Sequence, residues 1–205
     1  MDSFVAKAIQ MFEIFAAYLK ENAGLNDEEL KLVEAIPVVQ KRLRKRQYLL
    51  QEGDICHYNC FIASGCLRMY RTGADGIEHI LRFGVEHWWM ADYESYNFGR
   101  PTKNTIDALE DSNLIMIEKE DFEALFRLHP KLQRFRERLE AKSFDVSQNR
   151  ILSHISETAE EKYENFIKSY PKFHSRVPLH MIASYLGVTR ETLSRVRAKY
   201  GKTAS

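Results

Sequence analysis

The stretch LGVTRETLSRVRAK, residues 186–199, places side chains that can read nucleic-acid bases at helical spacing. If a helix begins after Thr189, four polar side chains share its exposed first turns: Arg190, Glu191, Ser194 and Arg195. An arginine can donate two parallel hydrogen bonds to guanine O6 and N7, and a glutamate can accept one from cytosine N4. The alternative is a solvated ion-pair face, in which Glu191 and Arg195 stabilise only each other. The first interpretation predicts base reading by these four residues.

The residues around this stretch have the pattern of two short helices joined by a tight turn. Gly187 falls where the first helix must end in a left-handed residue, and Ala183 is small where the helices cross. Thr189 is placed to cap the second helix. Five apolar positions have the spacing that locks two such helices together: Ile182, Leu186, Val188, Leu193 and Val196. The pattern predicts a helix-turn-helix whose second helix enters the DNA major groove.

Positive charge is concentrated at the C-terminal end of a chain that is otherwise nearly balanced. The 205 residues carry a formal net charge of +1, but the part from Lys172 onward has seven Lys or Arg against one Glu. Such cations contact phosphates, which position a protein on DNA without specifying the sequence. We therefore expect double-stranded DNA as a partner, with phosphate contacts from Thr189, Arg197, Lys199 and Lys202.

Residues 42–117 have the pattern of short strands. β-Branched and aromatic runs alternate with glycine-containing turns, and TGADG at 72–76 lies between two runs as a hairpin turn. In the run after this turn, residues 77, 79, 81 and 83 are expected on one face of a strand and residues 78, 80 and 82 on the other. Many short strands with regular turns predict an antiparallel sandwich or barrel.

Helical periodicity precedes and follows this region. The N-terminal stretch FVAKAIQMFEIFAAYL is interrupted by Lys7 and Glu13 and is shorter than a bilayer span, so it predicts an amphipathic helix and no membrane contact. Residues 131–156 predict one helix of roughly seven turns. Its narrow apolar stripe favours a dimer helix, and hence a homodimer, over a helix packed along its own β domain. The stripe consists of Leu132, Phe135, Leu139 and Val146.

These features together resemble the Crp/Fnr family of bacterial transcription regulators. GVTRETLSRV is close to the family's recognition-helix pattern, an Arg-Glu pair followed by a second arginine four residues after the glutamate. The segments EGD, NCFIASGCLRMYR and GIEHILRFG resemble the jelly roll of its cyclic-nucleotide-binding-like sensor domain. The resemblance covers nearly the whole chain. It implies a homodimer on a near-palindromic operator, with Arg190, Glu191 and Arg195 as base readers and RNA polymerase as a further candidate partner.

The fold expected is α+β with three parts. Residues 1–118 form N-terminal helices and an antiparallel jelly-roll sensor domain, 119–156 a short helix and the long dimer helix, and 157–205 a small winged-helix-like helix-turn-helix domain. Few residues follow the second helix of that motif, so any wing there is expected to be vestigial. Cys56, Cys60 and Cys66, an odd number in an apolar region, favour a reduced, cytoplasmic setting over a disulfide framework.

The resemblance does not extend to the cyclic AMP site. Members that bind cyclic AMP carry Gly-Glu and, further on, Arg-Ser or Arg-Thr followed by Ala. Here Ala91-Asp92 and the tripeptide KNT stand in those places. Asp92 and Glu94 would repel a phosphate, which needs a cation and free backbone N–H groups. Arg100 or Lys103 could substitute for the missing cation. We predict no cyclic nucleotide binding and no cofactor.

The stretch GVEHWWMADYESY and the loop after it supply a candidate effector pocket: Trp88, Trp89, Asp92, Tyr93, Arg100 and Lys103. A small apolar or amine-bearing effector could stack on the indole rings. The alternative, which we favour, is that the aromatic rings plug a vacated pocket and pack the roll against the long helix.

Other classes of function are weighed against gene regulation. An iron–sulfur cluster of the oxygen-sensing branch needs an N-terminal cysteine group, and residues 1–55 contain no cysteine, so buried thiols are expected instead. A cupin-like metal enzyme needs converging histidines, yet His57, His79 and His87 form no His-x-His pair, so we expect no enzyme and no metal. A jelly-roll module that binds a small ligand and signals through protein contacts is the other alternative. DNA binding with a steep salt dependence would exclude it.

Overall fold

The computed structural model describes residues 3–171 and 173–203, and the chain divides into two compact units. Unit 1 comprises Met1–Met69 and Phe83–Glu140, and unit 2 comprises Tyr70–Arg82 and Ala141–Ser205. The tip of one β-hairpin therefore belongs to the same unit as the C-terminal helices. The division runs through the long helix rather than at either end of it.

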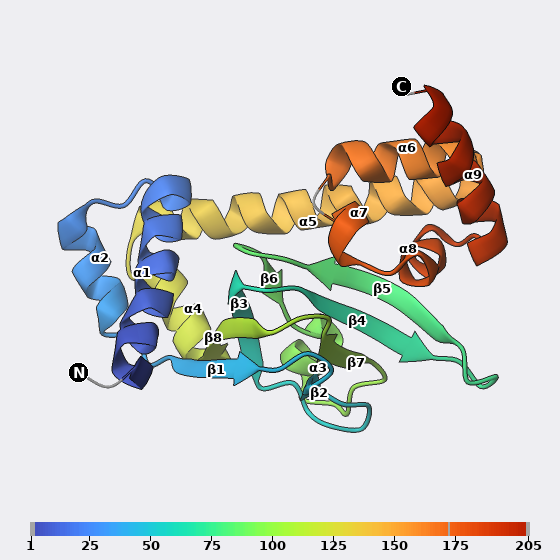
Figure 1. Ribbon diagram of the computed structural model, residues 1–205. Coiled ribbons are helices and arrows are strands. Elements are labelled where there is room, and N and C mark those ends of the chain that lie inside the picture. Colours follow the sequence, from blue (N-terminus) through green and yellow to red (C-terminus); the bar gives the residue numbers. More distant parts are fainter. Residues whose placement is uncertain (1–2, 172, 204–205) are drawn as a thin grey trace. The chain divides into compact units, whose positions relative to one another are not determined.

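The described residues form two four-stranded sheets (Figure 1). The first has the order β1-β8-β3-β6, with β1 Val39–Leu43, β8 Ser112–Glu118, β3 Tyr58–Ser64 and β6 Trp89–Met90. The second has the order β2-β7-β4-β5, with β2 Tyr48–Leu50, β7 Thr105–Ala108, β4 Leu67–Thr72 and β5 Glu78–Gly84. The pairs β1–β8, β3–β8, β3–β6 and β2–β7 are all antiparallel. The predicted α+β class and antiparallel jelly roll are confirmed.

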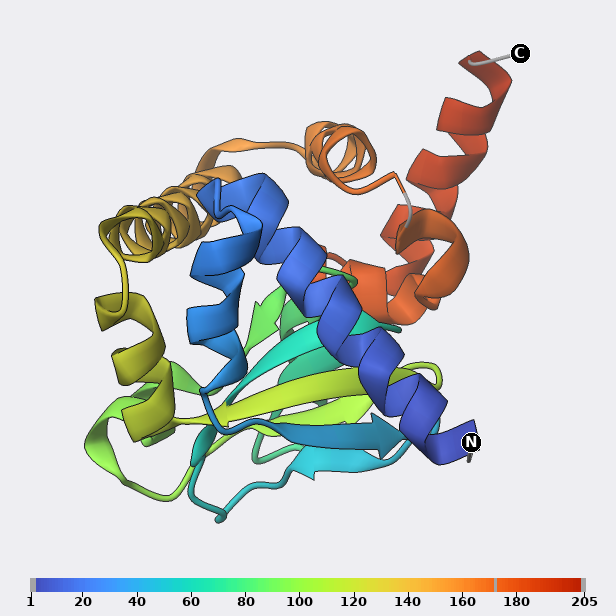
Figure 2. The same ribbon diagram turned by 90° about the vertical axis from the view of Figure 1, so that its left-hand side faces the viewer.

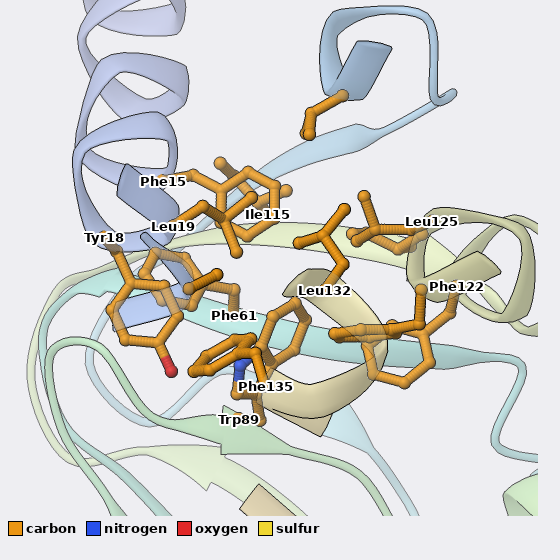
Figure 3. Packing of buried hydrophobic residues seen from close by; sticks show 14 of the residues in the cluster. Phe15, Tyr18, Leu19, Phe61, Trp89, Ile115, Phe122, Leu125, Leu132 and Phe135 are labelled. Carbon is orange, nitrogen blue, oxygen red and sulfur yellow. The ribbon is translucent and has the colours of Figure 1, made fainter. Parts of the chain in front are cut away.

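The core of unit 1 lies between the first sheet and helices. These are α1 Ser3–Ala23, α2 Asp27–Glu34, α4 Lys119–Arg127 and the first turns of α5 Pro130–Ser156. Phe61 of β3 lies opposite Ile115 of β8 and Trp89 of β6 in the register of the sheet. Because cross-strand partners share a face, these three side chains all point to the helices. Phe15 of α1 meets Phe61 with ring centroids 5.0 Å apart (Figure 3). Figure 2 shows how α1 runs across the first sheet.

The first turns of α5 belong to this core, which corrects one prediction. Leu132 is 1% exposed and Phe135 is 4% exposed, both within the cluster that Figure 3 shows. Leu139 packs against the same cluster, whereas Val146 is exposed. The prediction of one dimer seam through all four residues is therefore wrong for Leu132 and Phe135. Their apolar stripe covers the sheet and helices of its own chain.

Unit 2 contains the rest of α5 and four further helices in the described part of the chain. These are α6 Ala159–Ser169, α7 Phe173–Arg176, α8 Leu179–Leu186 and α9 Arg190–Thr203. Thr158 begins α6 with a reciprocal cap, because its hydroxyl accepts from the Glu161 N–H while the Glu161 carboxylate accepts from the Thr158 N–H. Within residues 3–171 and 173–203, no helix combines the length and the hydropathy that a membrane crossing requires.

Candidate nucleic-acid interface

The turn between α8 and α9 has the predicted chemistry. Gly187 ends α8 with φ +67° and ψ +35°, the left-handed conformation that glycine adopts without a Cβ penalty. The Val188 N–H then donates to the Ala183 carbonyl at 3.0 Å. Thr189 caps α9, since its hydroxyl accepts from the Thr192 N–H at 3.1 Å. The helix-turn-helix predicted from the sequence is confirmed.

The apolar side of the motif forms the small core of unit 2. Leu193 is 0% exposed and Val196 is 5% exposed, and the residues of α8 that they face are buried as well: Ile182, Ala183 and Leu186. Phe166 of α6 adds an aromatic ring 5.7 Å from that of Tyr185. Val188 is only partly buried. This packing fixes which face of α9 points away from the protein.

The face of α9 opposite Leu193 and Val196 is polar and exposed. It carries the four predicted base readers, all of them exposed: Arg190, Glu191, Ser194 and Arg195. Arg190 is the first residue of the helix, where the helix dipole disfavours a cation. The Arg190 guanidinium is therefore not stabilised by its own helix, and a hydrogen-bond acceptor outside the chain would stabilise it more. The arrangement therefore suits contact with an anionic or hydrogen-bonding surface outside the chain.

The residues predicted to contact phosphates are placed along the same helix and at its start. Thr189, Arg197 and Lys199 are exposed, and the Lys199 ammonium lies 3.4 Å from the Glu160 carboxylate. Both members of that ion pair are largely exposed, so it contributes little to stability. Lys202 lies in α9, but its side chain is outside the part of the chain that the structure describes.

α8 is tied to the hairpin tip that belongs to unit 2 (Figure 1). The Ser184 hydroxyl accepts from the Ile80 N–H at 3.0 Å and donates to the Glu78 carbonyl at 3.0 Å. One side chain thus satisfies two backbone groups of β5, which is an edge strand. Arg150 of α5 donates to the Leu81 carbonyl of the same strand. Since α9 follows α8 across a fixed turn, this link positions the exposed face of α9 within unit 2.

The Ser184 link gives a prediction for the backbone of β5. Ser184→Ala removes the acceptor of the Ile80 N–H, and such a hydrogen bond contributes about 1 kcal/mol. We expect the Ile80 amide to exchange with solvent several-fold faster, measured by hydrogen–deuterium exchange with NMR detection. Ser147→Ala is the matched control, because Ser147 donates only within its own helix, to the Ser143 carbonyl at 2.9 Å. Unchanged exchange at Ile80 in Ser184→Ala would show that the link does not form in solution.

Asp92, predicted as an effector-pocket residue, is instead a buried structural carboxylate. It caps α3 Tyr93–Phe98 by accepting from the Glu94 N–H at 3.1 Å and the Ser95 N–H at 3.4 Å. Its other oxygen accepts from the Thr102 hydroxyl and from the Asn104 amide at 3.0 Å. Four donors of this loop are therefore directed at a carboxylate of the chain itself. This arrangement supports the prediction of no cyclic nucleotide, since an anion here would compete with Asp92.

Trp89 also fills the protein rather than a pocket. It is 6% exposed, and its ring lies 5.1–5.8 Å from those of Phe15, Phe61 and Phe122. The effector-pocket assignment is therefore wrong for Trp89 and Asp92. Of the remaining candidates, Trp88 is half-buried, and Tyr93, Arg100 and Lys103 are exposed. A buried indole follows from the register of β6, which turns residue 89 towards the helices.

The histidines of the β region do not converge. His87 is exposed and lies nearly parallel to the Phe61 ring at 6.2 Å, and His79 lies beside Gly73 in the hairpin. Among the described residues, no three His, Cys, Asp or Glu side chains gather as a metal-binding group. The three cysteines are buried and form no disulfide, as predicted for Cys56, Cys60 and Cys66.

Comparison with known proteins defines the class. A family model described as "Cyclic nucleotide-binding domain" matches residues 40–129, a range that includes β2 to β8 and all of β1 except Val39. The molecule is therefore a β-roll domain of the cyclic-nucleotide-binding type joined to a helix-turn-helix. The chain is 27% identical to the Cyclic AMP receptor protein of Thermus thermophilus, over 84% of this chain and 81% of that protein. It is also 27% identical to the Fumarate and nitrate reduction regulatory protein of Vibrio cholerae, over 87% and 75% of the two chains.

The solved structure of FixK2 from Bradyrhizobium japonicum has the same fold. The match has a TM-score of 0.69 at 18% identity, and it covers 82% of this chain and 86% of that one. Over most of its length the chain is therefore similar to transcription regulators of the Crp/Fnr type.

Proposed function

We propose that the protein is a sequence-specific DNA-binding transcription regulator that reads base edges with α9. The observation that carries the proposal is the exposed polar face of α9, held outward by a buried apolar face and a capped turn. Arg190, Glu191 and Arg195 supply the donors and the acceptor that distinguish guanine and cytosine in the major groove. Lys199 and Arg197 supply contacts to phosphates.

A homodimer is part of the proposal, with a seam further along α5 than the sequence predicted. Phe144 is 62% exposed, Ile151 is 57% exposed and Ile155 is 79% exposed. Their spacings of seven and four residues place them on one side of the helix, as in a two-helix seam. Val146 and Leu152 are exposed nearby. A dimer through this stripe would present two recognition helices to successive major grooves, about 34 Å apart.

Regulation by cyclic nucleotides is not part of the proposal. The donors around α3 already serve the Asp92 carboxylate, and the buried Trp89 occupies the helix-facing side of the first sheet. We propose instead that any effector of the β domain has another chemistry. RNA polymerase stays a candidate partner of the DNA-bound protein.

Base reading by Arg195 is tested by binding to two kinds of DNA. Arg195→Ala is expected to lose about 1–3 kcal/mol on a specific site and to relax the preference at one base position of each half-site. The measurement is fluorescence anisotropy with a selected operator and with random-sequence DNA. An equal loss of affinity on both would show that Arg195 contacts phosphate instead.

Lys199→Ala serves as the matched control, since it also removes one cation from α9. It should weaken binding to all sequences alike and lower the slope of log affinity against log salt by about one. Glu160→Gln breaks the ion pair between Glu160 and Lys199 but keeps the lysine. It should leave the slope of log affinity against log salt unchanged or slightly steeper. If the wild-type protein shows no salt-dependent binding to DNA, the alternative is favoured, in which the chain is a small-ligand-binding module that signals through protein contacts.

A further inference from the structure

A row of sulfur atoms crosses the first sheet on the face away from the helices. In the register of the sheet, Cys60 of β3 lies opposite Met116 of β8 and opposite Met90 of β6. Cross-strand partners point to the same side, and the neighbouring row of Phe61 occupies the helix side. The three sulfur side chains therefore lie side by side on the other face. All three are buried, at 3% exposure for Cys60, 0% for Met90 and 7% for Met116.

A fourth sulfur joins this row from the loop before β3. A cavity of about 370 Å³ is lined by all four residues, Cys56, Cys60, Met90 and Met116, and we refer to it as the sulfur cavity. Cys56 is 7% exposed and is held in place by its N–H, which donates to the Ser95 hydroxyl at 2.9 Å. Other lining residues, among them His57 and Ile55, are exposed, so the cavity reaches solvent.

The two thiols of the sulfur cavity are electrostatically coupled. Burial raises the pKa of the Cys60 thiol well above its ordinary value, the nearby Cys56 raises it further, and the Lys41 ammonium acts in the opposite direction. Burial also raises the pKa of the Cys56 thiol. Lys41 lines the same cavity and can balance negative charge that forms there.

We propose that the sulfur cavity is a binding site for a soft monovalent metal cation of the Cu(I) class. Thiolate and thioether sulfur are the ligands that such cations prefer over nitrogen and oxygen. No third His, Cys, Asp or Glu gathers with the two thiols in the described residues, so Met90 and Met116 are the additional ligands at hand. The two cysteines would be the principal ligands and the two methionines the weaker ones.

The binding step balances without a change of oxidation state. Two S–H bonds break, two Cu–thiolate bonds form, and both protons pass to solvent while copper stays Cu(I). The neutral thioethers of Met90 and Met116 coordinate without releasing a proton. The site then carries one net negative charge, which the Lys41 ammonium offsets. All the residues of this site belong to the β domain, so copper uptake does not depend on DNA binding.

The test presents Cu(I) as its bicinchoninate complex to the full-length, reduced protein without oxygen. Wild type is expected to take up one copper per chain, seen as loss of colour of the bicinchoninate complex. Cys56→Ala and Cys60→Ala should each weaken uptake by about 100-fold or more, and Met90→Leu with Met116→Leu by about tenfold. Cys66→Ala is the matched control, because Cys66 is a buried cysteine, outside any disulfide, that does not line the cavity.

Two results would overturn the proposal. One is uptake by the Cys56→Ala, Cys60→Ala double variant equal to that of wild type. The other is a loss of copper uptake in Cys66→Ala as large as that in Cys56→Ala or Cys60→Ala, because removal of any thiol would then have the same effect. X-ray absorption at the copper edge keeps the test decisive if an alanine variant folds poorly. Sulfur neighbours around copper in the wild-type protein support the site, and a shell of nitrogen and oxygen alone contradicts it.

Discussion

Replacing Arg68 with methionine is expected to destabilise the β domain by about 3–5 kcal/mol, because it leaves a buried carboxylate without its principal partner. Arg68 of β4 and Asp107 of β7 form a two-pronged ion pair, with Nε–Oδ1 at 2.8 Å and Nη2–Oδ2 at 2.9 Å. The two side chains are only 9% and 10% exposed. A pair with this geometry gains energy from both hydrogen bonds, but each charge depends on the other for solvation.

Unfolding by urea measures the loss of stability in Arg68→Met. Urea is uncharged, so it does not screen the ion pair as a denaturing salt would. Arg42→Met is the matched control, since Arg42 pairs with Asp111 at 3.4 Å but both side chains are more than half exposed. It should change the free energy of unfolding little. The double variant Arg68→Met, Asp107→Leu should recover a large part of the loss, because no unpaired charge is left. A loss in Arg68→Met no larger than that in Arg42→Met would contradict the account.

Replacing Gly65 with alanine is expected to cost about 3 kcal/mol or more, through backbone strain and a backbone clash together. Gly65 connects β3 to β4 with φ +108°, a region that L-residues rarely adopt. A Cβ there would lie 2.6 Å from the Ser112 Cα, which cannot move without shifting β8. The Gly65 N–H also donates to the Glu86 carboxylate at 2.9 Å, which fixes the turn from the other side.

Gly53→Ala is the control that separates backbone strain from the steric clash with Ser112. Gly53 has φ +92°, but nothing lies within 4 Å of the Cβ that it would gain. The difference in unfolding free energy between the two alanine variants therefore measures the contact with Ser112. Ser112→Gly should not fully rescue Gly65→Ala, because the Ser112 Cα stays at 2.6 Å. Equal stabilities of Gly65→Ala and Gly53→Ala would mean that β8 shifts to accommodate the new methyl group at little cost in free energy.

The helix-turn-helix could be predicted because its determinants are local. Gly187 and Thr189 act on backbone groups within a few residues of themselves, and Leu193 and Val196 follow the period of their own helix. The outward face of α9 then follows by elimination. Helix caps and helix-ending glycines of this kind can be predicted from a single sequence without knowledge of the rest of the fold.

The arrangement of the β domain was harder to predict, because its side chains are positioned by strands far apart in sequence. Alternation over residues 77–83 predicted two faces, but could not show that Ile80 is buried at 5% exposure while Ile77, just before β5, is exposed at 56%. Leu132 and Phe135 have the spacing of a dimer seam, and only the packed helices show that they face their own core. Likewise, the alignment of Cys60 with Met90 and Met116 depends on sheet register, which no single strand encodes.

Sequence reading by α9 is tested most directly by selecting bound DNA from a random pool with the full-length protein. The expected product is an inverted repeat whose half-sites are centred one helical turn apart, roughly 10 base pairs. Repeating the selection with Arg195→Ala should relax one position in each half. A pool that stays random after several rounds, although the wild-type protein is folded, would contradict base reading by α9.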